Sequence, residues 1–350
     1  MKSYQIIDFG RPLRETVSAD PAPSGHEVVV AVEASGVCHS DLHIWDGGYD
    51  LGHGKKLNLK DRGIPLPLTL GHETAGRVLR VGADVVGLEI GERVLVYPWI
   101  GCGECRVCRE GLENLCMKPR SLGVYCDGGY SDEIVVPRAR YCLPLGGLDP
   151  IAAAPYACSG VTAYSALKKF GDLPKDEPLL IIGAGGLGLM CVAILKALGG
   201  KGAVVVDIDA SRRAAALEVG ALAAIDGAAP DALKQVWAAL GGPCWGAVDF
   251  VGAPQTAALG FDALAKGGKL VMVGLFGGAA PWSLPLVPMK AASIVGSYTG
   301  SLAELAELMD LARAGALPGI PIEVRPLDRA TRALEDLKAG RVTGRIVLTP

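Results

Sequence analysis

The stretch from Gly101 to Cys116, GCGECRVCREGLENLC, places four cysteines in one short lobe. Cys102, Cys105, Cys108 and Cys116 follow the spacing C-x2-C-x2-C-x7-C. A structural zinc site is typically closed by four such sulfur ligands. Free cysteines packed as small hydrophobes are the alternative, but the glycines, arginines and glutamate of this stretch are typical of a polar loop. The spacing therefore predicts a structural zinc. It also places the chemistry elsewhere, because a closed site leaves no open position.

The composition limits the classes of protein to which the chain can belong. It has 350 residues, half of them hydrophobic, and a formal net charge of −3. This length predicts about two domains. Lysine and arginine form no block, which argues against nucleic acid or an anionic membrane as a partner. The ten cysteines occur in a chain whose N-terminus lacks an apolar signal core. We therefore expect metal binding in a reducing compartment, with a cytoplasmic location.

The chain has two parts that differ in their expected secondary structure, and we expect residues 146–154 to form the hinge between them. The first part has short strands between glycine turns, which is typical of a barrel-like β unit. From about residue 178, apolar strands alternate with helices, which predicts a parallel sheet covered on both faces. The expected strands are 26–34, 75–81, 93–97, 178–182, 203–207, 223–225, 247–251, 269–273, 293–295 and 345–349. The expected helices are 186–198, 211–219 with Ser211 as its cap, 302–314 and 329–339.

A glycine-rich turn lies in the second part. Residues 183–188 read GAGGLG, the pattern GxGxxG, between an apolar strand and a helix. Such glycines allow a tight turn and let a pyrophosphate approach a helix N-terminus. Asp207 follows about 20 residues later, where a carboxylate accepts hydrogen bonds from the adenosine ribose. A carboxylate there repels a 2′-phosphate and favours NAD over NADP, although Arg212 and Arg213 could accommodate a phosphate. The alternative is an ordinary glycine turn.

Taken in order, four motifs resemble the zinc-dependent medium-chain alcohol dehydrogenase family. They are Cys38-His39-Ser40-Asp41, Gly71-His72-Glu73, the four-cysteine lobe and the GxGxxG turn. Residues 71–85, GHETAGRVLRVGADV, also fit that family's zinc signature. The resemblance implies an α/β protein with a GroES-like, β-rich catalytic domain at residues 1–155 and 297–350. A Rossmann domain with a doubly wound parallel sheet would be inserted between them at residues 156–296.

The resemblance implies a second, catalytic zinc held by Cys38, His72 and Cys158. Two thiolates and one imidazole leave the fourth position open, as a catalytic zinc requires. Asp41 falls where a carboxylate orients the zinc-bound histidine. Glu73 falls where the family has a carboxylate near the metal that occasionally ligates it. Taken alone, Cys158 is more typical of a core cysteine.

The resemblance also assigns the proton path and the coenzyme site. Ser40 and His43 match the family's proton relay, and a histidine suits this role because its ordinary pKa is near neutrality. We expect Arg345 to contact the pyrophosphate and Arg212 to lie on the adenosine side. The implied coenzyme residues are His39, Thr162, Gly183, Gly185, Gly186, Leu187, Gly188, Asp207, Ile208, Arg212, Val273, Gly274, Leu275 and Arg345.

The implied activity is the reversible, NAD-linked oxidation of a primary or secondary alcohol to an aldehyde or ketone. The implied enzyme carries two zinc ions per chain, takes a small alcohol or carbonyl substrate and forms a homotetramer or homodimer. Residues 287–296 are the expected subunit contact. Trp45, Trp99 and Leu275 are the candidate pocket residues. Residues 46–69 form a long segment that departs from the family's common pattern. We expect it to shape the substrate entrance or a subunit contact, or to be a surface insertion.

Three other functions remain open at this point. One is a polyol or sugar dehydrogenase of the same superfamily, which the motifs barely separate from an alcohol dehydrogenase. A second is a zinc-free quinone or enone reductase on the same fold, which the candidate ligands oppose. The third is a zinc-ribbon protein that binds nucleic acid, which the dinucleotide motif and the absence of a basic face oppose.

Overall fold

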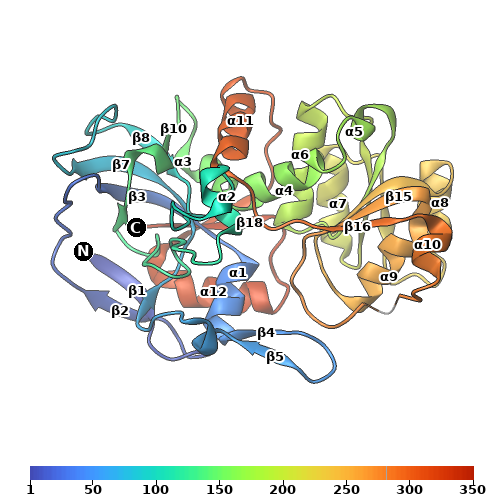
Figure 1. Cartoon of the computed structure of the whole chain (residues 1–350), viewed down its shortest axis with the longest axis horizontal. Helices are drawn as coiled ribbons and strands as arrows, with labels where there is room; N and C mark the ends of the chain where they lie inside the picture. Colours follow the sequence, from blue (N-terminus) through green and yellow to red (C-terminus); the bar gives the residue numbers. More distant parts are fainter. Residues whose placement is uncertain (281) are drawn as a thin grey trace.

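The computed structural model describes residues 1–280 and 282–350. The molecule is elongated, with a β-rich unit at one end and an α/β unit at the other (Figure 1). Both chain termini lie in the β-rich unit, so the chain leaves that unit and returns to it. The described α-helices are α1 (His39–Asp46), α2 (Arg106–Arg109), α3 (Pro150–Ala153), α4 (Ser159–Lys168), α5 (Leu173–Asp176), α6 (Gly186–Ala197), α7 (Ala210–Val219), α8 (Ala232–Leu240), α9 (Pro254–Ala263), α10 (Leu286–Lys290), α11 (Leu302–Arg313) and α12 (Ala330–Lys338).

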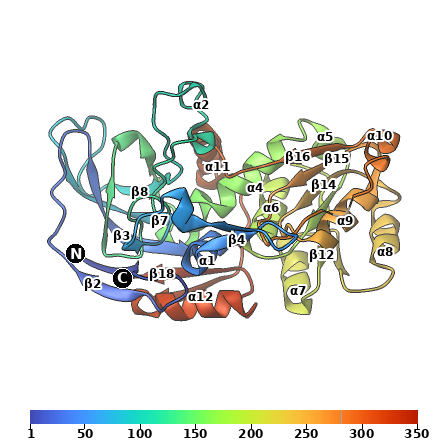
Figure 2. The same cartoon turned by 60° about the horizontal axis from the view of Figure 1, so that its bottom comes forward.

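Two sheets make up most of the β-rich unit. The larger sheet has seven strands and is centred on β3, which pairs antiparallel with β7, β9 and the C-terminal β18. The smaller sheet has three strands in the order β2-β1-β6. A separate hairpin, β4–β5, projects toward the α/β unit (Figure 2). The strands are β1 (Lys2–Ile6), β2 (Arg14–Val17), β3 (Val28–Val37), β4 (Gly48–Asp50), β5 (Lys56–Asn58), β6 (Leu68–Thr69), β7 (Glu73–Val81), β8 (Arg93–Val96), β9 (Glu133–Val136), β10 (Cys142–Pro144), β17 (Ile322–Pro326) and β18 (Arg345–Thr349).

The α/β unit is a six-stranded parallel sheet in the order β13-β12-β11-β14-β15-β16. Counted from β11, this is the order 3-2-1-4-5-6 of a dinucleotide-binding fold. The strands are β11 (Leu179–Ile182), β12 (Ala203–Asp207), β13 (Ala223–Asp226), β14 (Cys244–Asp249), β15 (Leu264–Met272) and β16 (Ser293–Gly296).

Both faces of the parallel sheet are buried, as the continuous apolar strands predicted. Successive side chains of a strand point to opposite faces. Leu179 and Ile181 of β11 pack in one hydrophobic cluster with residues of α4 and α6. Leu180 and Ile182 pack in another cluster with residues of α8 and α9. The apolar sequence of β11 is therefore explained by two helical layers, one on each face.

Most expected elements lie where the sequence placed them, and the differences are at their ends. β12 and β18 have the expected bounds. The cap of α7 is Asp209 rather than Ser211, because the Asp209 carboxylate accepts hydrogen bonds from the backbone amides of Ser211 and Arg212 at 2.8 and 3.0 Å. No helix in residues 1–280 or 282–350 is long and apolar enough to cross a membrane. The uncharged stretch 179–195 forms β11, the glycine turn and most of α6.

Tyr97 ties the β-rich unit to the segment that returns from the parallel sheet. Its side chain is completely buried, and its hydroxyl donates to the Gly300 carbonyl at 2.8 Å. Removing the hydroxyl would leave a buried carbonyl without this donor, and such a loss typically costs about 1–3 kcal/mol.

We therefore expect Tyr97→Phe to lower the free energy of unfolding by about 1–2 kcal/mol. Urea unfolding monitored by circular dichroism measures this change. An unaltered unfolding midpoint would show that the Tyr97–Gly300 hydrogen bond does not stabilise the return segment.

Candidate active site

Ligand groups from distant parts of the chain converge at one end of β3. Cys38 follows β3 directly, and Cys158 comes just before α4. The pairing of β3 with β7 sets Gly36 opposite Glu73, which brings His72 to the same end of the sheet. One potential ligand atom from each of Cys38, His72, Glu73 and Cys158 lies within 4.8 Å of the other three. All four residues are buried.

The His72 imidazole is held by a carboxylate. Its Nδ1 hydrogen-bonds to Asp41 Oδ1 at 3.0 Å. Asp41 Oδ2 accepts the Cys38 backbone N–H at 2.9 Å and the Tyr130 hydroxyl at 3.2 Å. A carboxylate at Nδ1 favours the tautomer with its proton there, which leaves the Nε2 lone pair available to a metal. Asp41 thus fixes both the orientation and the tautomer of His72.

The donor set fits a zinc ion. His72 Nε2 is buried and has no hydrogen-bond partner in the described part of the chain, and an unpaired buried nitrogen is unfavourable. The Cys38 and Cys158 sulfurs lie 3.9 Å apart. Two sulfurs on a tetrahedral zinc, each at about 2.3 Å from the metal, lie about 3.8 Å from one another. A hydrogen bond with Cys158 lowers the pKa of Cys38 well below its ordinary value, which favours the thiolate needed for metal binding.

A buried ion pair links these ligands to the glycine turn. Arg345 donates from Nη2 to Glu73 Oε2, and the Ser159 backbone amide donates to Glu73 Oε1 at 3.2 Å. Burial raises the pKa of Glu73 to about 7, while the attraction of Arg345 opposes that shift. A Cβ added to Gly186 would lie 2.2 Å from Arg345 Cδ, so the arginine packs directly against the first turn of α6. Arg345 is therefore in place between the ligand cluster and the coenzyme turn.

The expected proton-relay residues lie on α1, immediately after Cys38. Ser40 and His43 are both partly exposed, and His39 is exposed on the same helix. The His43 ring lies against the Tyr49 ring, with centroids 4.6 Å apart. Burial lowers the pKa of His43, which favours the neutral form that can accept a proton.

The glycine turn leaves space for a ligand. Gly183 has a φ of +94°, and a Cβ on Gly188 would lie 1.8 Å from the Gly183 carbonyl oxygen. Nothing lies within 4 Å of the position of a Cβ on Gly185, so the backbone there is open to an approaching group. Asp207 holds the turn, since Oδ2 accepts the Ala184 amide at 2.7 Å. This geometry fits a pyrophosphate at the N-terminus of α6.

The remaining coenzyme residues surround this turn and the end of β15. The Arg212 guanidinium donates to the carbonyls of Gly340 and Val342 at 3.1 and 3.3 Å, and Arg213 donates to the Asp207 carbonyl at 2.9 Å. Thr162, Val273 and Gly274 are at least partly buried, whereas Leu275 and Ile208 are exposed. Leu187 is in the first turn of α6.

Of the three candidate pocket residues, Trp99 lies at the metal ligands. Its ring centroid is 5.2 Å from that of His72 and 6.3 Å from that of Tyr298. Asn114 of the four-cysteine lobe donates to the Tyr298 carbonyl at 3.0 Å and supports that wall. Trp45 does not line the site. Its ring packs in the second core cluster and its indole N–H donates to a backbone carbonyl, as is usual for a buried tryptophan.

The four-cysteine lobe brings its sulfurs together as expected. The Sγ–Sγ distances are 3.9 Å for Cys102–Cys108, 3.4 Å for Cys105–Cys108 and 3.8 Å for Cys105–Cys116. Cys116 Sγ also accepts the backbone amides of Cys102 and Lys118, both at 3.3 Å. Hydrogen bonds from the backbone amides at positions 104 and 105 lower the pKa of Cys102 to about 6. Four sulfurs at these distances fit a closed zinc site.

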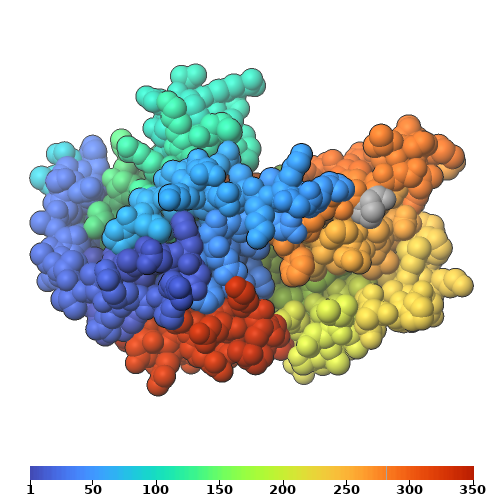
Figure 3. Space-filling model, turned by 90° about the horizontal axis from the view of Figure 1, so that it is seen from below, coloured from blue at the N-terminus to red at the C-terminus, as the bar shows by residue number. Residues whose placement is uncertain are grey.

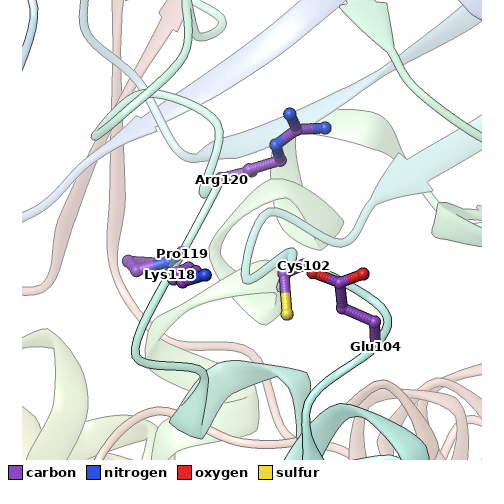
Figure 4. A pocket seen from close by; sticks show the side chains of 5 residues that line it. All are labelled: Cys102, Glu104, Lys118, Pro119 and Arg120. Carbon is purple, nitrogen blue, oxygen red and sulfur yellow. The ribbon is translucent and has the colours of Figure 1, made fainter.

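An open cleft of about 480 Å³ lies beside this lobe (Figure 4). It is lined by Cys102, Glu104, Lys118, Pro119 and Arg120. A zinc ion with four thiolates has a net charge of about −2, and Lys118 and Arg120 of the cleft lining bring positive charge to this side of the lobe. The cleft is therefore accounted for by the metal lobe.

Sequence patterns missed several residues that support the site. Tyr130 donates to Asp41, Tyr49 lies against His43, and the Ser159 amide donates to Glu73. None of them belongs to a metal-ligand or dinucleotide motif. Only their place in the sequence could have indicated two of them, because Ser159 follows Cys158 and Tyr49 lies in the long segment 46–69.

Comparison with known proteins agrees with this geometry. Residues 24–147 match the family described as alcohol dehydrogenase GroES-like domain, and residues 186–314 match that described as zinc-binding dehydrogenase. The chain is 38% identical to an NAD-dependent alcohol dehydrogenase of Saccharolobus solfataricus and 37% identical to one of Sulfurisphaera tokodaii, in each case over 100% of both chains. The crystal structure of an alcohol dehydrogenase from Aeropyrum pernix superposes with a TM-score of 0.89 at 31% identity, again over 100% of both chains.

The fold, the two ligand clusters and the glycine turn define a metal-binding, dinucleotide-linked oxidoreductase. Within that class, the chain belongs to the zinc-dependent medium-chain alcohol dehydrogenase family.

The cysteine lobe gives a direct test of metal content. Cys116→Ser removes one sulfur of that cluster, so we expect the zinc content to fall from about two ions per chain to about one, with a lower melting temperature. Metal analysis by mass spectrometry and differential scanning calorimetry measure both effects. Cys126→Ser is the control, because Cys126 is an exposed cysteine outside both clusters. An unchanged zinc content in Cys116→Ser would refute the structural site.

Proposed function

We propose that this chain is an NAD-dependent zinc alcohol dehydrogenase that converts a primary or secondary alcohol to an aldehyde or ketone, reversibly. The observation that carries this proposal is the buried, unpaired Nε2 of His72 facing the sulfurs of Cys38 and Cys158. Arg345 supports it further, because this side chain packs against both Glu73 and the coenzyme turn. Full-length relatives at 35–38% identity are named NAD-dependent alcohol dehydrogenases.

The residues of the site have separate roles in this reaction. Cys38, His72 and Cys158 would hold zinc, which acts as a Lewis acid on the alcohol oxygen, while NAD accepts the hydride. Asp41 keeps His72 in the tautomer that binds metal. Glu73 balances the Arg345 charge, so the arginine can be buried between the metal ligands and α6.

The alcohol proton leaves along α1. The Ser40 hydroxyl accepts a hydrogen bond from the alcohol O–H, and His43 passes the proton toward solvent. His43 suits this step because burial lowers its pKa and keeps the imidazole neutral at pH 7, so it is ready to accept a proton. Its partial exposure gives the proton a way out.

The preference for NAD over NADP follows from Asp207 and its neighbours. Its carboxylate is at the end of β12, held by the Ala184 and Asp209 amides, and would repel a 2′-phosphate. Arg212 and Arg213 each direct part of the guanidinium to backbone carbonyls, and Arg213 also lies 3.5 Å from Asp226 Oδ1. Asp207 would accept hydrogen bonds from the adenosine ribose.

A sugar is the second candidate substrate. The chain is 33% identical to a D-arabinose 1-dehydrogenase (NADP+) of Saccharolobus solfataricus over 100% of this chain and 97% of that protein. The crystal structure of a D-arabinose dehydrogenase from Sulfolobus solfataricus superposes with a TM-score of 0.84 at 29% identity. The aromatic wall of Trp99 and Tyr298 favours an apolar alcohol over a polyol.

We also propose a homodimer or homotetramer assembled through the edge of the parallel sheet. β16 is the outermost strand, and the nearby side chains of Leu284 and Met289 are 81% and 66% exposed. None of the ten cysteines, all in the described part of the chain, is in a disulfide, which supports a cytoplasmic location. The domain boundaries that we propose are residues 1–155 with 297–350, and residues 156–296.

Turnover should require the buried ligands. We expect Cys38→Ser and His72→Asn each to lower kcat/KM for alcohol oxidation at least 10³-fold, because each removes a ligand of the Lewis acid. NADH absorbance across a panel of hydrophobic secondary alcohols, sorbitol, threonine and arabinose measures activity and ranks the substrates. Near-normal oxidation by Cys38→Ser would refute the zinc mechanism.

The preference for NAD over NADP should depend on the Asp207 carboxylate. We expect Asp207→Ser to raise kcat/KM with NADP relative to that with NAD by about tenfold or more, since it removes the charge that repels a 2′-phosphate. Asp262→Ser, which removes an exposed carboxylate on α9, is the control. If both variants kept the wild-type ratio, Asp207 would not set the preference.

A further inference from the structure

The β4–β5 hairpin, part of the long segment 46–69, crosses from the β-rich unit to the parallel sheet. Figure 3 shows the two units in contact here, with the blue segment that contains the hairpin against the orange part of the second unit. The hairpin belongs to neither large sheet, since β4 pairs with β5 alone. The hairpin is therefore held in this position by its contacts with the two units rather than by either large sheet.

The tip packs closely against the loop that follows β15. The Gly278 amide donates to the Asp50 carbonyl at 3.3 Å. Gly52 is buried, whereas its neighbours Leu51 and His53 are exposed. A Cβ on Gly52 would lie 2.7 Å from the Ala279 nitrogen and 2.8 Å from its Cβ. The contact therefore depends on a glycine at position 52.

The same hairpin is close to groups that the proposed function uses on both sides. At its base, Tyr49 lies against His43. At its tip, it touches residues 277–279, which come directly after Val273 to Leu275, the segment expected to hold the nicotinamide. That loop is anchored to the sheet, because the Phe276 amide donates to the Val251 carbonyl at 3.0 Å. The hairpin thus connects the proton-relay histidine to the nicotinamide segment.

We propose that the β4–β5 hairpin is a strap over the nicotinamide end of the coenzyme, and that its contact with residues 277–279 limits the rate at which the coenzyme leaves. This inference rests on the proposed function for the presence of a coenzyme. Among the described residues, the tip contact consists of one long hydrogen bond and of van der Waals contact of Gly52 with Ala279 and of Asp50 with Gly277, with exposed residues on either side of Gly52. Few buried groups hold it, so it can open locally without unfolding either unit. In many enzymes with such closing elements, release of product limits turnover.

A matched pair of glycines tests the strap. Gly52 and Gly54 have φ values of +77° and +74°, so an alanine strains the backbone equally at either position. A Cβ on Gly52 collides with Ala279, whereas nothing lies within 4 Å of a Cβ on Gly54. We expect Gly52→Ala to raise the NADH dissociation rate about tenfold, with a matching loss of affinity, and Gly54→Ala to stay within about twofold of wild type. Stopped-flow fluorescence of bound NADH measures the rate, and zinc content confirms intact metal sites.

A second pair of variants changes the same contact from the α/β unit. It tests the proposal even if Gly52→Ala folds poorly. Ala279→Leu enlarges the side chain that Gly52 meets, whereas Ala280→Leu enlarges its exposed neighbour. We expect faster NADH dissociation from the first variant alone. Equal dissociation rates within each pair would overturn the strap and leave the proposed function intact. A wild-type chain that binds no NADH would instead overturn the proposed function.

Discussion

The hydrogen bond between Asp41 and His72 is the interaction on which the site depends. It lies in a completely buried environment, where a carboxylate needs several donors to be stable. The donors come from three places in the chain, namely the Cys38 amide, the Gly71 amide with the neighbouring His72 ring, and the Tyr130 hydroxyl. The long β3–β7 pairing holds the first two at one end of the sheet. The β-rich unit therefore serves as a rigid support for one imidazole.

A second buried charge pair, Arg345 with Glu73, connects the metal ligands of the β-rich unit to the α/β unit. Arg345 is 4% exposed and is the first residue of β18, whose next three residues, 346–348, pair with β3. Its partner Glu73 begins β7, while its stem lies against Gly186 at the start of α6. Breaking such a pair leaves one charge buried alone, which is strongly destabilising. The C-terminal strand thus fixes the coenzyme turn relative to the metal ligands.

The sequence predicted the parallel sheet and the four-cysteine lobe because each rests on a local, repeated pattern, whereas Cys38 and His72 were grouped through the family resemblance. Apolar strands alternating with helices indicated the parallel sheet, and cysteine spacing indicated the lobe. Cys158 was found through family position alone, since no local spacing marks it. Trp45 was wrongly placed in the pocket, because a tryptophan next to an active-site helix can face either the core or the site. The Tyr130 and Tyr49 contacts arise from tertiary packing between segments far apart in the chain, which no short pattern encodes.

Asn114 gives the cysteine lobe a role beyond stability. It belongs to the loop that Cys108 and Cys116 enclose, and it supports the backbone of Tyr298 at the aromatic wall. A metal ion that never meets the alcohol would in this way shape the surface against which the alcohol rests. Loss of the ion from the lobe would loosen the loop that carries Asn114 and, with it, the support of the Tyr298 backbone.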